Sequence, residues 1–441
     1  MRPRPTHDDP WAPYAPSAAE PWDRRRVVHL HRRAGFGATW EEAERDLADG
    51  PGPSVDRLLT GLPDTGEFEA TAARLADAAM ASPEPGRLKG WWADRMLRSP
   101  DPLGERLTLM WHDHFAAANR KVDDLGAMRR QNEAQRRLAR GPFAALLGAM
   151  LRDPALLAWL DAAGNTREHP NENLARELME LFTLGVGRYA EADVKDAARA
   201  LTGWRVVDGR ARFVASRHDD TPKAILGRTG PAGLDELLGR LIDHPATPLR
   251  LAWRLCKEFL GESTAPPDAL RALADGLRAN DLDIGWGVAT ILRSGLFHGG
   301  PDLGARVAGP AEFVVGAARS LGLVDPAPST PVLADAMARL GQDLLDPPNV
   351  GGWPGGRAWI TTRSALGRAA YASMLVGGLD IGLPEPVDPR ALAARHGRAA
   401  DPTFFPRLLL GLDAPAVPLD DPKSAHRALS RLLASPEVQR T

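Results

Sequence analysis

The sequence predicts a mainly α protein, a large multi-helix domain with at most a short β-hairpin near residues 204–214. Apolar residues recur about every 3.6 positions from Val27 to the C-terminus, whereas strict alternation of apolar and polar residues is scarce. Helix start signals precede several of these stretches, including Thr39 followed by Glu42 and the pair Asp153-Pro154. Helices are therefore expected over most of the chain.

The expected helices are joined by short connectors rich in proline and glycine, none of them long enough for a flexible linker. One hairpin is expected at 203–214, because β-branched residues flank Asp208-Gly209, a strong two-residue turn signal. After the capping pair at residues 39–42, the helices are expected at 90–97, 105–118, 125–138, 155–160, 173–184, 193–202, 234–241, 248–260, 268–278, 288–294, 310–321 and 330–340.

The chain divides into three expected parts. Residues 1–26 hold prolines and charges and are expected to be poorly ordered, residues 27–383 form the main helical domain, and residues 384–441 form a small helical portion that packs on it. The first 26 residues contain no apolar run of the length that a signal peptide or a membrane span requires. We therefore expect a cytoplasmic protein without membrane insertion.

Charge and cysteine content exclude several classes of protein. The 441 residues include 55 basic and 57 acidic side chains, so a net charge of −2 gives no global reason to bind nucleic acid. A single cysteine excludes an intramolecular disulfide framework and any metal site with several thiolates. A metal site in this chain would depend on nitrogen and oxygen ligands, with at most one cysteine sulfur.

An acidic row is expected on the helix at 173–184. Asn173, Glu177 and Glu180 follow the i, i+4, i+7 spacing that places side chains on one helical face, and leucines form the adjacent apolar stripe. Two carboxylates and an amide beside a core could bind a hard cation, act as a general acid and base, or accept arginines from a neighbouring helix.

Two histidines lie in the segment Trp111-His112-Asp113-His114-Phe115. Positions i and i+2 point about 200° apart on a helix, so His112 and His114 cannot both bind one ion while the helix is regular. At most one of them is expected to face a site. The alternative for each is a buried histidine whose hydrogen bonds are satisfied locally.

A third polar cluster follows the expected hairpin. His218, Asp219, Asp220 and Lys223 lie within six residues, in a loop of the kind that often carries functional side chains. Lys223 is one of only six lysines, the other basic residues being arginine. The alternative is a solvated loop with local turns.

A glycine-rich aromatic loop follows at 349–359, where Trp353 and Trp359 are expected to line or cover a pocket. Its four glycines fit neither the dinucleotide-binding pattern nor a P-loop. The chain also lacks the GxSxG, HExxH, CxxC and Glu-x-x-His patterns of the α/β-hydrolases, zincins, thiol-redox proteins and di-iron bundles.

These stretches give the sequence a resemblance to the DUF1800 family, a bacterial group named only as a domain of unknown function. The matching segments are HLHRRAGFGAT (29–39), ERLTLMWHDHFA (105–116), the run from PNENLARELM to ALTGW (170–204), HDDTPKAILG (218–227), PPNVGGWPGGRAWI (347–360) and LLASPEVQ (432–439). The resemblance implies a helical fold. It also suggests a partner from the DUF1501 family, many members of which carry twin-arginine export signals. Export while bound to such a partner is therefore the alternative to a cytoplasmic location.

We expect a metal-dependent enzyme acting on a small molecule or glycan, with iron, manganese or zinc held by histidine and carboxylate ligands. A redox-active ion would support oxidation or oxygenation, which we favour slightly over hydrolysis by zinc-bound hydroxide. Lys223 would orient an anionic substrate group, and Asn173 would lie in the substrate pocket. The alternatives are a non-catalytic scaffold and a metal-free glycan hydrolase using Glu177, Glu180 and Asp219. The expected ligands are one of His112 and His114, with Glu177, Glu180, His218 and Asp219.

Overall fold

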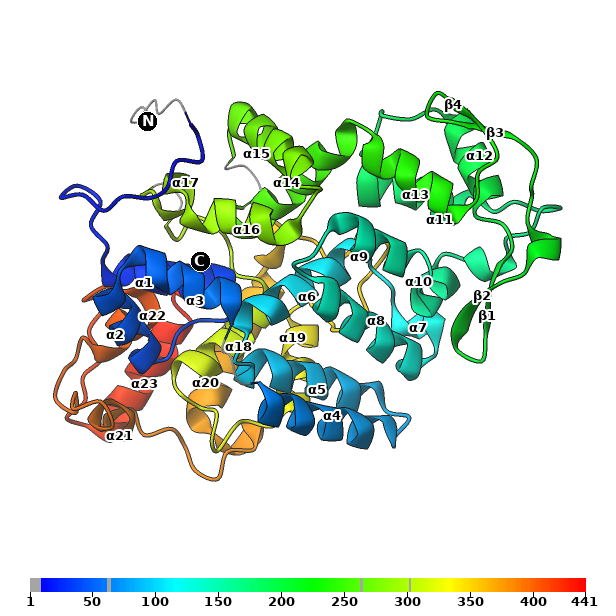
Figure 1. Ribbon diagram of the computed structural model, residues 1–441. Helices are drawn as coiled ribbons and strands as arrows, with labels where there is room; N and C mark the ends of the chain where they lie inside the picture. The colour runs from blue at the N-terminus through cyan, green and yellow to red at the C-terminus, as the bar shows by residue number, and fades with distance from the viewer. Residues whose placement is uncertain (1–8, 62–64, 262–264, 301–302) are drawn as a thin grey trace.

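A computed structural model describes residues 9–61, 65–261, 265–300 and 303–441, and the mainly α fold is confirmed (Figure 1). The first eleven helices in chain order are α1 (Arg24–Ala34), α2 (Trp40–Asp49), α3 (Pro51–Thr60), α4 (Gly66–Met80), α5 (Pro85–Arg98), α6 (Pro102–His114), α7 (Asn119–Val122), α8 (Leu125–Leu138), α9 (Phe143–Met150), α10 (Pro154–Trp159) and α11 (Glu172–Glu177). A π-helix, η2 (Leu178–Thr183), continues α11 directly.

The second half of the described chain repeats the pattern of short helices and tight connectors. Its helices are α12 (Glu191–Ala200), α13 (Leu234–Asp243), α14 (Ala246–Phe259), α15 (Pro267–Ala279), α16 (Ile284–Arg293), α17 (Gly295–His298), α18 (Pro310–Ser320), α19 (Thr330–Arg339), α20 (Thr362–Gly377), α21 (Pro389–Ala394), α22 (Phe404–Leu410) and α23 (Pro422–Leu433). The described residues also contain four short 3₁₀ turns, namely η1 (Ala162–Gly164) before α11, η3 (Ala215–Arg217), η4 (Gly356–Trp359) and η5 (Leu379–Ile381).

Two small antiparallel hairpins interrupt the helices between α12 and α13. The expected one pairs β1 (Trp204–Val207) with β2 (Arg210–Phe213), and its turn residues Asp208 and Gly209 both have positive φ, as the turn signal requires. The second pairs β3 (Lys223–Ile225) with β4 (Arg228–Gly230) and was not predicted from the sequence. Its turn is made by Leu226 and Gly227, also at positive φ, and leucine gives no turn signal.

Capping explains where the helices begin. The Thr39 side chain accepts a hydrogen bond from the Glu42 backbone N–H while the Glu42 carboxylate accepts one from Thr39, the predicted capping box of α2. Asp101 accepts a bond from Gly104 and precedes Pro102 at the first position of α6. Helix α6 therefore begins three residues before the predicted start at residue 105.

The buried apolar side chains form two large cores that meet at α6. One core joins α5, α18 and α19 with α20 to α23, and the other joins α6 with α9 to α16. Leu109 of α6 belongs to the first core, whereas Leu107 and Met110 belong to the second. Every residue of α6 is buried except Asp113. Helix α6 is thus the central element of the molecule, as its position in Figure 1 also shows.

The C-terminal portion lies against the main body. Helix α23 packs on α20 and α21, and α22 packs on α1, so that these helices gather at the lower left of Figure 1. At the other end of the chain, Trp11 is buried and donates a hydrogen bond to the Ala269 carbonyl oxygen at 2.8 Å. Residues 1–8 of the segment that we expected to be poorly ordered lie outside the described residues.

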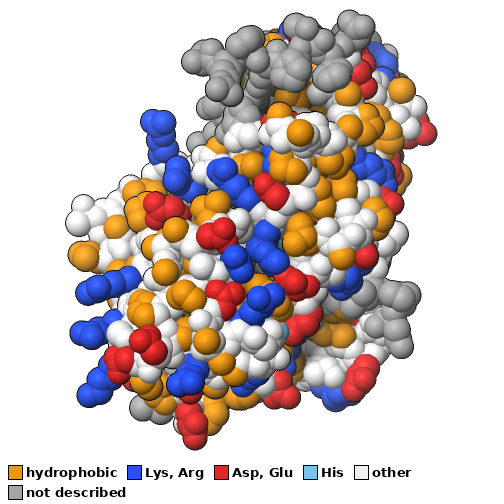
Figure 2. All heavy atoms as spheres, turned by 90° about the vertical axis from the view of Figure 1, so that its left-hand side faces the viewer, with side chains coloured by type: hydrophobic (Ala, Val, Ile, Leu, Met, Phe, Trp, Pro, Cys, Tyr) orange, Lys and Arg blue, Asp and Glu red, His pale blue; other side chains and the backbone are white. Residues whose placement is uncertain are grey.

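The surface carries mixed charge. Figure 2 shows lysine and arginine side chains interspersed with aspartate and glutamate over the face that looks left in Figure 1. Among the described residues, we find no helix with both the length and the apolar character needed to cross a membrane.

Candidate functional site

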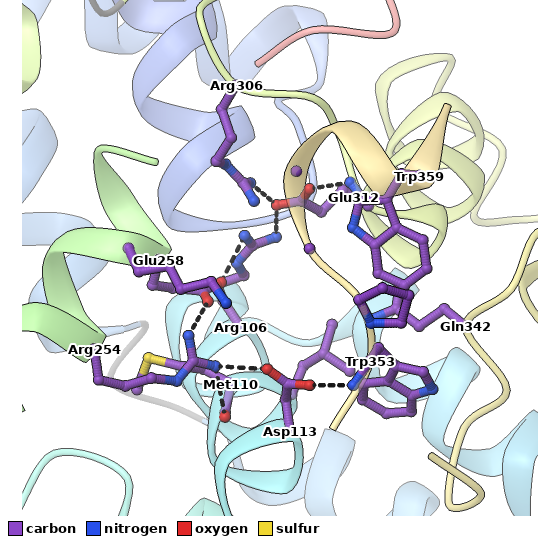
Figure 3. Close-up of a pocket in the computed structure, with 16 residues that line it drawn as sticks. Arg106, Met110, Asp113, Arg254, Glu258, Arg306, Glu312, Gln342, Trp353 and Trp359 are labelled. Carbon is purple, nitrogen blue, oxygen red and sulfur yellow. Dashed lines mark hydrogen bonds and ion pairs between the residues drawn. The ribbon is translucent and has the colours of Figure 1, made fainter. Parts of the chain in front are cut away.

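A polar pocket opens where α6 and α14 meet the start of α18 and the loop at 342–359 (Figure 3). Its charged lining residues come from segments far apart in the sequence: Arg106, Asp113, Arg254, Lys257, Glu258, Arg306 and Glu312. These are four cationic and three acidic side chains. Leu109, Met110, Trp353, Pro354 and Trp359 provide apolar walls.

Asp113 lies at the C-terminal end of α6, where it is the one residue of that helix that is not buried. Its Oδ1 accepts a hydrogen bond from the Trp353 backbone N–H at 2.7 Å. Its Oδ2 accepts one from Arg254 at 3.1 Å, and the same guanidinium donates to the Met110 carbonyl oxygen at 2.9 Å. Arg254 therefore ties α14 to the last turn of α6 at the point where the carboxylate enters the pocket.

A chain of ion pairs crosses the pocket from α14 to α18. Glu258 accepts from Arg106 at 2.6 Å and from Arg254 at 3.3 Å. Arg106 also pairs with Glu312, and Glu312 pairs in turn with Arg306. The second Glu312 oxygen accepts from the Gly309 backbone N–H, which caps α18. Arg106 and Glu312 are almost fully buried. Their charge-assisted bonds therefore lie in the interior and link the two apolar cores.

The three carboxyl groups differ in their affinity for protons. Burial opposes ionisation of Glu258, but its arginine neighbours outweigh burial and lower the pKa of Glu258 to about 2. Arg106 and Arg306 likewise outweigh burial at Glu312 and lower its pKa. The Asp113 side chain is 23% exposed, and its partial burial outweighs the opposing Arg254 and raises its pKa. Asp113 is thus the one pocket carboxyl that holds a proton more readily than an ordinary aspartate.

The aromatic wall depends on close packing of the loop against α6. Trp353 is 5% exposed and Trp359 is 7% exposed, and Figure 3 shows both indoles on one side of the pocket. Gly352 precedes Trp353 with φ of 82°, and a Cβ atom there would lie 2.2 Å from Asp113 Oδ1 and 2.5 Å from the Asp113 carbonyl oxygen. Only glycine permits this approach, which brings the Trp353 N–H to the carboxylate.

Comparison with known protein families decides the family of this chain. The family described as "Protein of unknown function (DUF1800)" matches residues 29–440. The chain belongs to the DUF1800 family. All the charged residues of the pocket lie within the matched range. Neither the curated proteins nor the solved structures include a match.

In this DUF1800 chain, Trp353 and Trp359 line the pocket as expected, and His112 lies behind Trp353. The His112 ring centroid is 5.6 Å from that of Trp353 and 5.3 Å from that of Trp92. Neither ring nitrogen of His112 has a hydrogen-bond partner among the described residues, and burial lowers the His112 pKa to about 3. His112 is therefore a neutral part of the aromatic packing under the pocket wall.

His114 contacts the π-helix instead of the pocket. The His114 Nε2 donates a hydrogen bond to the Phe182 carbonyl oxygen at 3.1 Å. Arg250 of α14 donates two bonds, at 2.9 and 3.1 Å, to the neighbouring carbonyl oxygen of Leu181. The wider π turn leaves backbone groups outside the usual helical bonding, and these two side chains satisfy them. The π-helix thereby binds both α6 and α14 next to the Asp113–Arg254 pair.

The predicted acidic row is distributed along α11 and η2. Asn173 donates to the Leu160 carbonyl oxygen at 3.3 Å. Glu180 accepts from the Tyr189 hydroxyl at 2.8 Å. Glu177 is half-buried, and burial together with the nearby Glu180 raises its pKa. None of the three lines the pocket around Asp113.

The predicted loop cluster is held by hydrogen bonds to Arg199 and Thr202 and by bonds within the loop. The His218 Nδ1 lies 3.0 Å from the Thr202 carbonyl oxygen. Asp219 accepts from Arg199 at 2.7 Å, and this bond lowers its pKa. Lys223 is buried at 1% exposure and donates to the carbonyl oxygens of Asp219 and Thr221. Lys223 therefore closes the turn between Asp219 and β3.

The expected metal ligands do not gather in the described part of the chain, where no group of three or more histidine, cysteine, aspartate or glutamate side chains could hold a metal ion. The sequence analysis did not select Asp113, Arg106, Arg254, Glu258 or Glu312. One signal was present for Asp113, since it is the acidic residue between His112 and His114 near the end of the helix. The arginines gave none in a chain that contains 49 of them.

Proposed function

We propose that this DUF1800 protein is an enzyme whose active site is the pocket around Asp113, with Asp113 exchanging a proton with a small anionic substrate. One observation supports it most: Asp113 is the one residue of the central helix α6 that is not buried, and its side chain enters a charged hollow. A carboxylate placed at the end of a rigid, fully packed helix is well positioned for chemistry.

The contrast among the three carboxyl groups supports the proton role. Glu258 and Glu312 have lowered pKa values, so they stay ionised and hold the arginines in place. The raised pKa of Asp113 moves it toward the range in which a carboxyl group can donate and accept protons near neutral pH. Environments that separate the pKa values of neighbouring acids are typical of acid–base sites.

The charge of the pocket supports an anionic substrate. Four cationic side chains against three carboxylates give a formal charge of +1, which becomes +2 when Asp113 is protonated. Electrostatic attraction in a partly buried hollow concentrates anions there.

The test compares wild type with Asp113→Asn on a panel of p-nitrophenyl substrates: the phosphate, sulfate and acetate esters and the glucuronide. Loss of a general acid or base is expected to reduce kcat by about 100-fold or more. The matched control is Asp335→Asn, an exposed carboxylate of α19 paired with Arg339. A carbon NMR titration of the side-chain carboxyls, assigned by difference against Asp113→Asn, measures the Asp113 pKa directly. A value at or below that of an ordinary aspartate would refute the proton role.

The functions expected from the sequence stay predictions. One is oxidation or hydrolysis that depends on iron, manganese or zinc held by His112, His114, Glu177, Glu180 and His218. The others are glycan hydrolysis and a scaffold role with a DUF1501-family partner. Each function needs its own test. The same is true of a cytoplasmic location.

A further inference from the structure

The hydrogen bonds inside the pocket restrict what can bind there. All six oxygens of the three carboxylates already accept a bond from the protein. Asp113 accepts from Trp353 and Arg254, Glu258 from Arg106 and Arg254, and Glu312 from Arg106, Arg306 and Gly309. A guanidinium group offers five N–H donors and no acceptor. The pocket therefore presents donors, and a matching ligand carries acceptors.

The donors reach the pocket from different elements. Arg254 comes from α14 and Arg306 from the segment before α18, and Figure 3 places them on separate sides of the hollow. The N-terminal end of α18, at Gly309, adds the positive end of a helix dipole. Donors that converge from several directions suit a tetrahedral oxyanion better than a flat carboxylate, which is matched by one planar fork.

Size and charge point to the same group. The cavity of about 80 Å³ is several times the roughly 10–15 Å³ that a cavity needs to hold one water molecule. It therefore has room for a ligand group larger than water, such as a phosphoryl group. The pocket charge of +2 with Asp113 protonated is neutralised by a dianion, and a phosphate monoester carries a charge of about −2 above its second pKa near 6.

We propose that the pocket recognises the dianionic phosphoryl group of a phosphate monoester, and that binding takes up a proton at Asp113. This inference depends on the proposed function, since it names the substrate class of the same site. A second negative charge beside Asp113 favours its protonated form, and Arg254 and Arg306 then pair with the phosphoryl oxygens as well as with the carboxylates.

The experiment is isothermal titration calorimetry of the full chain at about pH 8, where methyl phosphate is a dianion. Methyl phosphate, methyl sulfate and acetate are compared, each in buffers of different ionisation enthalpy so that proton uptake is measured. We expect methyl phosphate to bind at least about tenfold more tightly than the two monoanions, with uptake of up to one proton. Asp113→Asn, which imitates the protonated acid, is expected to bind methyl phosphate at least as tightly and without proton uptake.

Charge variants test the placement of the ligand. Arg306→Gln removes a charged donor and is expected to weaken methyl phosphate binding about tenfold or more. Lys257→Met, on the rim of the pocket, gives a second variant if loss of the Glu312 pair impairs folding. The control is Arg228→Gln, an exposed residue of β4 paired with Asp243, which is expected to bind as wild type does.

Two results would overturn the inference. Acetate or methyl sulfate binding as tightly as methyl phosphate would show that the pocket does not select the phosphoryl dianion. Failure of wild type to bind methyl phosphate at millimolar concentration would do the same. Neither result changes the measured Asp113 pKa or the turnover of Asp113→Asn. Those two measurements test the proposed function, so its failure is distinguished from failure of this inference.

Discussion

Gly352 is the position where one added methyl group should disturb the site most. A Cβ atom there would lie 2.2 Å from Asp113 Oδ1 and 2.5 Å from the Asp113 carbonyl oxygen, and φ is 82°. The left-handed backbone costs a non-glycine residue about 1–2 kcal/mol. Relief of the overlap adds about 1–3 kcal/mol, because the carbonyl belongs to the packed helix α6 and cannot turn away. We expect Gly352→Ala to lower the free energy of unfolding by about 2–5 kcal/mol.

The same change should also weaken methyl phosphate binding, because the Trp353 N–H can no longer approach Asp113 at 2.7 Å. Urea denaturation gives the stability, and titration with methyl phosphate gives the affinity. Gly351→Ala is the matched control, since a Cβ there meets only the Asn349 side chain, at 3.1 Å, in an exposed part of the loop. Equal stability and affinity of the two alanine variants would refute the close-approach argument.

Two further predictions rest on the structure and a third on the sequence. Arg250→Gln removes both hydrogen bonds to the Leu181 carbonyl oxygen and should lower the free energy of unfolding, measured by urea denaturation, by about 1–3 kcal/mol. It should also weaken methyl phosphate binding, and unchanged affinity would contradict a positioning role for Arg250. Burial raises the pKa of Asp153 from 3.8 to about 7, so the free energy of unfolding of wild type should fall as pH rises through this window, whereas that of Asp153→Asn should not. Denaturation between pH 4 and 8 measures this, and an equal dependence of stability on pH in both proteins would refute the prediction. The sequence-derived metal site predicts iron, manganese or zinc bound in stoichiometric amount and lost in Glu177→Ala and His218→Ala; elemental analysis without metal, even after reconstitution, would remove that prediction.

Local signals in the sequence were sufficient for part of the secondary structure. The capping box of Thr39 and Glu42 and the turn at Asp208-Gly209 act within four residues, and both are present as predicted. The π-helix was not predicted, because the apolar spacing of 173–184 is also that of a regular helix. Its wider turn depends on His114 and Arg250, which bind its carbonyl oxygens from distant helices.

The site was only partly predictable, since its charged residues are brought together by packing between distant segments. Trp353 and Trp359 were expected to line a pocket because aromatic residues in a glycine-rich loop are conspicuous in the sequence. Asp113 and Arg254 lie 141 residues apart, and no spacing rule joins them. Lys223 was selected for its rarity, yet it is buried and binds backbone oxygens within its own loop.

One polar group noted in the sequence, His114, nevertheless affects the pocket indirectly, together with Arg250. His114 follows Asp113 on α6, and Arg250 lies one turn before Arg254 on α14. Each binds a carbonyl of the same π-helix, at Phe182 and Leu181 respectively. The relative position of α6 and α14, and with it the 3.1 Å contact between Arg254 and Asp113, is therefore fixed by a backbone segment outside the pocket. A change in the π-helix that moves one carbonyl should shift the Asp113 pKa without altering any residue that touches the ligand.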